Sequence, residues 1–183
     1  MRKAVSVFLA LSCILVSAGA AFAAKVAITS VGQSPDGMMV RVLTKKLGVE
    51  TDYDAMMKSV SLGADLEVLI AVVGGSSKGL GAAGIDKEEE SARAVALVEA
   101  ARQKNVKILV MHVGGEGRRG ELTDLFVRAV APLGDRLIVV KSGNADNIFG
   151  TLKAPDAALI EAENIQAAAA PLGEALKEWG AVK

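Results

Sequence analysis

The chain alternates short apolar segments with segments whose hydrophobic residues recur every three or four positions. The first kind is typical of strands buried on both faces in a parallel sheet, and the second of helices that cover the sheet. Five strands are expected, at residues 25–31, 49–53, 66–73, 106–113 and 136–140. This alternation predicts an α/β fold, a three-layer sandwich around a five-stranded, mostly parallel sheet in the flavodoxin-like order 2-1-3-4-5.

Polar residues mark where the expected helices begin. Ser34-Pro35-Asp36 predicts a helix start, because serine caps, proline suits the first helical position and aspartate favours the positive end. The buried face of that helix is expected to carry four apolar residues, Met39, Val40, Leu43 and Leu47. Asp54 is expected to cap a brief helix with Met56, Met57 and Val60.

The helix expected from Asp86 has the clearest start in the chain. Glu89 completes a capping-box-like pair with Asp86. Glu89 and Arg93 are expected to stand one turn apart on the solvent side of this helix. The tail after Asn144 is expected to be helical in two or three pieces, broken or kinked at Pro171.

The N-terminus has the pattern of an export signal. Arg2 and Lys3 precede an apolar run at residues 4–16, and Ala21-Phe22-Ala23 fits a cleavage site. The sequence thus predicts a signal peptide at residues 1–23, a single α/β domain at residues 24–183, and a periplasmic or secreted protein with no membrane span after cleavage. A retained N-terminal anchor is the alternative.

Cleavage would change the charge and the cysteine content. Of 21 basic residues, Arg2 and Lys3 would leave with the signal, so 19 would face 21 acidic residues. That balance argues against nucleic acid and anionic membranes as partners. Cys13 is the only cysteine and His112 the only histidine, which argues against a zinc site. Carboxylates could still bind calcium, but no loop of spaced Asp and Asn residues indicates it, so no metal site is expected.

Polar residues gather in the loops that follow the expected strands. Ligands of open α/β sheets bind beyond the carboxyl ends of the strands. The candidate binding residues in those loops are Gln33, Ser34, Ser76, Ser77, Lys78, Glu116, Arg118, Arg119 and Asn144. The guanidinium groups of Arg118 and Arg119 could grip a carboxylate or phosphate, so a small polar or anionic ligand is expected. The alternative is two solvated arginines near Glu121 and Asp124.

The stretch from Gly74 to Gly84 contains the spacing G-x-G-x-x-G at Gly79, Gly81 and Gly84. In dinucleotide-binding folds this motif starts at the end of the first strand, whereas here it begins six residues after Val73. We therefore expect a long mobile flap that offers hydrogen-bond donors, not a nucleotide site. Aromatic residues are too few at these loops to stack on a flavin, so no cofactor is expected.

A hydrolase is the alternative from a different class of function. Ser76 or Ser77 would be the nucleophile, His112 the base and Glu116 the residue that orients it. No G-x-S-x-G elbow supports this arrangement, and a buried, hydrogen-bonded structural histidine is favoured. The sequence leans against an enzyme without deciding the question.

Four segments carry a family resemblance: ITSVGQSPDG, GGSSKGLGAAGI, HVGGEGRRGELTDLF and IVVKSGNADNIF. Together they resemble a family of exported bacterial proteins known only as a domain of unknown function, often encoded beside transport genes. The resemblance supplies no catalytic residues. It implies a periplasmic location and a role as a transport accessory or binding protein; a partner-binding envelope protein without a small ligand is a further alternative.

Overall fold

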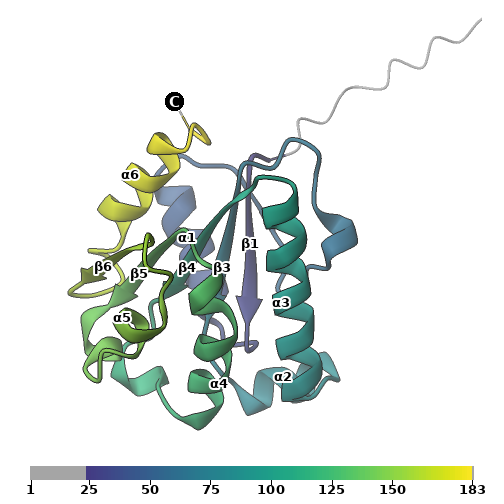
Figure 1. Cartoon of the computed structure of the whole chain (residues 1–183), viewed down its shortest axis with the longest axis vertical. Helices are drawn as coiled ribbons and strands as arrows, with labels where there is room; N and C mark the ends of the chain where they lie inside the picture. Colours follow the sequence, from purple (N-terminus) through teal and green to yellow (C-terminus); the bar gives the residue numbers. More distant parts are fainter. Residues whose placement is uncertain (1–23, 183) are drawn as a thin grey trace, which may run out of the picture.

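The structure, a computed structural model, describes residues 24–182 and shows an α/β fold around one parallel sheet. The sheet has six strands in the order β2-β1-β3-β4-β5-β6 (Figure 1). The strands are β1 (Val26–Val31), β2 (Thr51–Tyr53), β3 (Val68–Val73), β4 (Lys107–His112), β5 (Arg136–Val140) and β6 (Ala158–Ala162). The parallel sheet and the order of its first five strands are confirmed, whereas the count of five is wrong. The expected signal peptide lies outside the described residues.

The sixth strand lies in the tail that was expected to be helical throughout. β6 pairs in parallel with β5 from Arg136–Ala158 to Val140–Ala162. Its alanine, leucine and glutamate residues suit a helix, but the open edge of β5 offers backbone partners that outweigh this preference. Helices α5 (Ile148–Leu152) and α6 (Ala169–Glu178) flank it. Pro171 lies in the first turn of α6, where its missing N–H is tolerated, so it does not break the helix.

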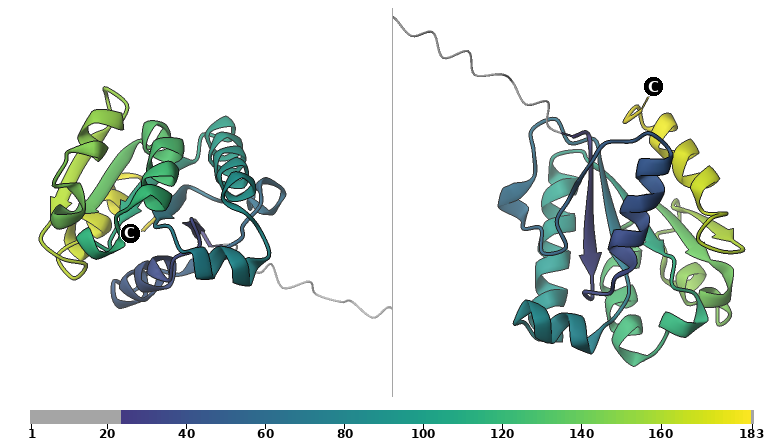
Figure 2. Two further views of the ribbon diagram at one scale, coloured as in Figure 1. Left: turned by 90° about the horizontal axis from the view of Figure 1, so that it is seen from below. Right: turned by 180° about the vertical axis from the view of Figure 1, so that it is seen from behind.

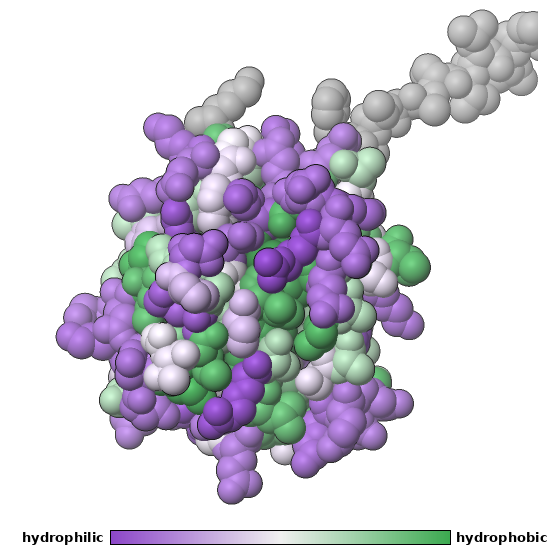
Figure 3. Space-filling view, viewed as in Figure 1, coloured by the Kyte–Doolittle hydropathy of each residue, from purple (hydrophilic) through white to green (hydrophobic). Residues whose placement is uncertain are grey.

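Helices cover both faces of the sheet (Figure 1; Figure 2, right). α1 (Asp36–Lys46) and α6 pack on one face, and α3 (Lys87–Gln103), α4 (Glu121–Val130) and α5 on the other. Hydrophobic side chains reach the surface in the middle of the face with α3 and α4 (Figure 3). Within α1, Val40 and Leu43 are buried as expected. Met39 and Leu47 are 44% and 39% exposed, because α1 meets the sheet along a narrower line than the pattern predicted.

The brief helix expected after Asp54 differs from the structure, whereas the expected start of α3 does not. Asp54 caps a turn, with its Oδ1 accepting from the Met56 amide, and a short 3₁₀ helix η1 (Ser59–Ser61) follows in place of an α-helix. Met57 is buried, but Val60 is 90% exposed. The capping box of Asp86 and Glu89 at the start of α3 is confirmed.

The expected glycine flap is wrong, because most of it forms helix α2 (Ser77–Ala83). The Ser76 side chain caps this helix by accepting from the Gly79 amide, and Gly84 ends it with a left-handed φ of 70°. A Cβ at Gly79 would lie 2.0 Å from the Gln33 carbonyl oxygen. The glycine there lets α2 pack against the β1–α1 loop.

Candidate functional site

The loops that follow β1, β3, β4 and β5 lie together at the carboxyl-terminal edge of the sheet, which is the lower edge in Figure 1 and faces the viewer in Figure 2, left. The Ser34 amide donates to the Gly74 carbonyl at 3.1 Å, and the Ser76 amide to the Gly32 carbonyl at 2.8 Å. Across the edge, the Glu116 amide lies 3.4 Å from Ser142 Oγ. These contacts join the loop after β1 to the loop after β3, and the loop after β4 to the loop after β5.

Asp36, the first residue of α1, is a buried carboxylate beneath this edge. Its side chain is 1% exposed, and neither of its oxygens accepts a hydrogen bond from any residue between 24 and 182. Gly74 and Gly114 leave room for it, since a Cβ at these positions would lie 2.9 and 2.8 Å from Asp36 Oδ2. A buried acceptor without a donor is costly, so this carboxylate is the most unusual polar group of the edge.

Arg118 covers Asp36 from the short 3₁₀ helix η2 (Glu116–Arg118). Its Nε lies 3.5 Å from Asp36 Oδ1, and its side chain is 37% exposed. Thr123 holds the backbone of Arg118: the Thr123 hydroxyl donates to the Arg118 carbonyl at 2.6 Å and accepts from the Gly75 amide at 2.9 Å. Within residues 24–182 the terminal guanidinium nitrogens of Arg118 donate no hydrogen bond and remain available to a ligand.

Arg119 has a different environment from its neighbour. Its Nε donates to Asp124 at 2.8 Å, its Nη2 donates to Asp146 at 2.9 Å, and Nη1 donates to the Gly143 carbonyl. The hydrogen bonds to Asp146 and Asp124 raise the pKa of Arg119. The same bond from Arg119 lowers the pKa of Asp146 to about 2. Arg119 therefore crosslinks α4 to the loop after β5 and has no free fork for a ligand.

The remaining candidates divide between structural and exposed positions. Ser34 is buried and accepts from the Asp36 amide at 3.3 Å. Asn144 is buried, donating to Glu161 at 2.7 Å and accepting from the Phe149 amide at 3.0 Å. Ser34 and Asn144 therefore stabilise the loops of this edge through internal hydrogen bonds. Three candidates stay exposed on it: Ser77, Lys78 and Glu116.

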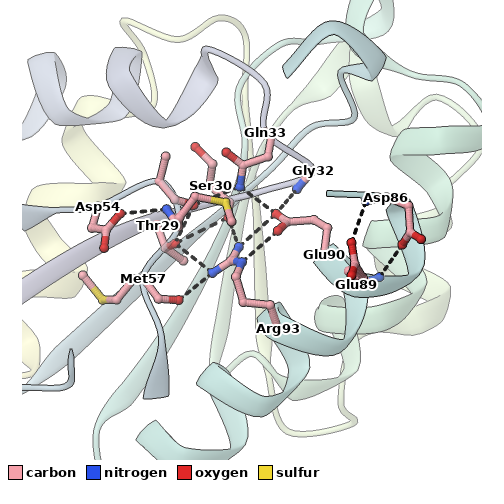
Figure 4. A network of polar contacts seen from close by, with 12 residues as sticks. Thr29, Ser30, Gly32, Gln33, Asp54, Met57, Asp86, Glu89, Glu90 and Arg93 are labelled. Carbon is pink, nitrogen blue, oxygen red and sulfur yellow. Dashed lines mark hydrogen bonds and ion pairs between the residues drawn. The ribbon is translucent and has the colours of Figure 1, made fainter. Parts of the chain in front are cut away.

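A second polar network lies behind the β1–α1 loop, centred on Glu90 and Arg93 of α3 (Figure 4). Glu90 is fully buried; its carboxylate accepts from the Gly32 amide at 2.8 Å, from Gln33 Nε2 at 2.9 Å and from Arg93 Nε at 2.7 Å. Arg93 also donates to the Ser30 and Met57 carbonyls. The predicted solvent position of Arg93 is therefore wrong. We call this network the Glu90–Arg93 clamp, and the Gln33 side chain is part of it.

Sequence reasoning missed this network. Glu90 was not among the residues singled out in the sequence, but position 90 lies one turn before the buried Ala94 and two turns before Leu97. That spacing places Glu90 on the apolar side of α3, and an acid there signals a buried partner. Asp36 was likewise read only as a favourable first-turn residue.

His112 is fully buried and bonded on both sides of its ring. Nδ1 lies 3.0 Å from the Val73 carbonyl oxygen and Nε2 3.2 Å from that of Gly115. The ring stacks on Phe149 with centroids 5.5 Å apart. Both ring nitrogens therefore face backbone carbonyl oxygens. Neither nitrogen is hydrogen-bonded to Ser76, whose hydroxyl caps α2. The structure does not bring Ser76, His112 and Glu116 together as a hydrolytic trio.

A large open hollow of about 820 Å³ lies at the opposite, amino-terminal edge of the sheet. Lys25, Gly48, Glu67 and Ala181 are among its lining residues. Its charged pair, Lys25 and Glu67, is already joined at 2.6 Å. Volume alone would favour this edge, but the unpaired polar atoms of Asp36 and Arg118 lie at the other. The described residues hold no group of three His, Cys, Asp or Glu side chains placed for a metal ion, and no helix long and apolar enough to cross a membrane.

Comparison with known proteins identifies the family of the chain. No curated protein and no solved structure gives a significant match. A family described as Domain of unknown function (DUF6305) matches residues 23–176, which include the whole sheet and every candidate residue above. The chain therefore belongs to the DUF6305 family.

Proposed function

We propose that the protein binds a small polar or anionic ligand at the carboxyl-terminal edge of its sheet, with Arg118 as the principal contact. The observation that supports this proposal is the state of Arg118. Asp36 holds its Nε at 3.5 Å, while its terminal nitrogens are unengaged by residues 24–182 and the side chain is 37% exposed. A guanidinium with both terminal nitrogens unengaged offers a fork to a carboxylate or phosphate.

The charges around Arg118 favour a ligand with a single anionic group. Arg119 is neutralised by Asp124 and Asp146, and Asp36 offsets part of the charge of Arg118. Glu116 is exposed two residues before Arg118 and would repel a polyanion. Lys78 adds one exposed cation to the edge, which Glu116 offsets, so little net positive charge is left for a multiply charged ligand.

Location and partner belong to the same proposal. The export pattern of residues 1–23 supports a periplasmic or secreted protein. In that compartment a small binding protein would serve as a transport accessory that hands its ligand to a transporter component. The hydrolase is not favoured, because both nitrogens of His112 face backbone carbonyls.

A thermal-shift screen with acetate, lactate, phosphate and sulfate at constant ionic strength tests the proposal. A ligand at about 100 times its Kd should add about 2.7 kcal/mol to the stability. Arg118→Ala should remove this gain, whereas Arg128→Ala, which changes an exposed arginine on α4, should keep it. An equal shift in the Arg118 variant, or no shift with any anion, would refute the assignment.

A further inference from the structure

From the buried carboxylate beneath Arg118, we infer that the ligand is a zwitterion, whose anionic group binds Arg118 and whose ammonium group binds Asp36. This inference rests on the proposed function and adds the class of ligand. Both Asp36 oxygens are buried and accept no hydrogen bond within the described chain. Among residues 24–182, Arg118 Nε, at 3.5 Å from Oδ1, is the only cation paired with them.

Charge balance is the first argument. An anion on the terminal nitrogens of Arg118 would be separated from the Asp36 carboxylate by one guanidinium group. Two negative charges would then share a single positive charge in a partly buried place, and like charges repel strongly there. A ligand that also brings an ammonium group restores two charges of each sign, so a zwitterion should bind more tightly than the matching simple anion.

Access to Asp36 is the second argument. The hypothetical Cβ positions of Gly74 and Gly114 lie at 2.9 and 2.8 Å from Asp36 Oδ2, and no side chain grows from either residue toward the carboxylate. The atoms nearest to a Cβ at Gly114 are the Cβ and Cγ of Arg118, and Ser34 Oγ lies nearest to one at Gly74. Because the Arg118 guanidinium has only its 3.5 Å contact with Asp36 to give up, this side chain can turn outward with the ligand's anion and uncover the carboxylate.

Three probes with three carbons each test the inference: β-alanine carries both charges, propionate only the anion and propylamine only the cation. Glycine and 4-aminobutyrate vary the distance between the two charges. By calorimetric titration of the chain from residue 24 onward at pH 7, we expect at least one of the zwitterions to bind at least tenfold more tightly than propionate, and propylamine not to bind. Propionate binding as tightly as the best zwitterion would overturn the inference while leaving the proposed function intact. If no zwitterion and no anion of the earlier screen binds, both fail.

Asp36→Asn gives the matched control, because it keeps the shape of the side chain and removes its charge. The variant should lose at least tenfold in affinity for the zwitterion and keep or gain affinity for propionate. An unchanged ratio of the two affinities in a folded variant would contradict the role of Asp36. If the variant does not fold, the ratio of zwitterion to propionate in the wild-type protein decides alone.

Discussion

Asp36 and Arg118 form an unequal ion pair: Asp36 Oδ1 and Arg118 Nε are 3.5 Å apart, but the carboxylate is 1% exposed and the arginine side chain 37%. The buried partner depends on the exposed one, because water cannot replace the guanidinium around Asp36. The exposed partner keeps its terminal nitrogens for other contacts. This inequality links the stability of the carboxyl-terminal edge to the binding role proposed for Arg118.

Removing the arginine should therefore cost stability through the acid it leaves behind. We expect Arg118→Ala to lower the free energy of unfolding by about 1–2 kcal/mol, less than for a fully buried pair because Arg118 is partly solvated. Adding Asp36→Asn should recover most of that loss. Urea unfolding of the two single variants and the double variant measures the coupling, and purely additive effects would contradict the pairing.

The glycines of α2 give a matched pair of substitutions within one short helix. Gly79→Ala should destabilise the protein by about 1–3 kcal/mol, because the new Cβ would meet the Gln33 carbonyl. Gly81→Ala should add up to about 1 kcal/mol, since a Cβ there meets open space and alanine favours the helix. Thermal unfolding separates the two. Equal effects at both positions would show that the glycines serve a flexible loop, as the sequence had suggested.

Local patterns allowed parts of the fold to be predicted, and long-range contacts decided the rest. The capping box of Asp86 and Glu89 is an interaction between near neighbours, so its spacing is visible in the sequence. The buried strands β3 and β4 are also visible locally, because each contains a continuous apolar run. The strand at Leu159 and Ile160 depends on pairing with β5, which no local pattern reveals.

The Glu90–Arg93 clamp should be among the costliest interactions to break. Glu90→Ala would leave Arg93, whose side chain is 9% exposed, without its carboxylate and would release the Gly32 amide. A loss of about 3–5 kcal/mol is expected in urea unfolding. Glu88→Ala on the exposed side of α3 is the control and should stay within about 0.5 kcal/mol. Similar small losses for both variants would contradict a structural role for the clamp.

The Arg119–Asp146 bond predicts a specific dependence of stability on pH. The pKa of Asp146 is lowered to about 2 by its hydrogen bond from Arg119. Since the folded pKa lies below the unfolded one, the bond stabilises the protein above about pH 4 and this contribution is lost as the pH falls toward 2. Asp146 is 57% exposed, so the contribution should not exceed about 1 kcal/mol.

Asp146→Asn provides the comparison for this pH dependence. The difference in unfolding free energy between wild type and variant should shrink steadily between pH 5 and pH 2, as followed by urea unfolding. A difference that stays constant over this range would mean that the charge of Asp146 does not stabilise the fold.

The candidate site was predictable only in its position. The rule that ligands bind beyond the strand ends led to the loops with Arg118, but it could not separate Arg118 from Arg119. That distinction depends on Asp146, which follows β5, and on Asp36, which starts α1. Distant residues meet at this edge only in the folded chain, so their pairing is invisible in the sequence.

The most direct test of ligand binding at Arg118 is to locate the bound anion by NMR. Titration of the ¹⁵N-labelled protein with the anions of the screen should shift the backbone amides of residues 114–118, those of the first turn of α1, and the Arg118 Nε–H signal. Shifts that gather instead around Lys25, Gly48 and Glu67, beside the hollow at the opposite edge, would contradict the account, as would a spectrum that does not change.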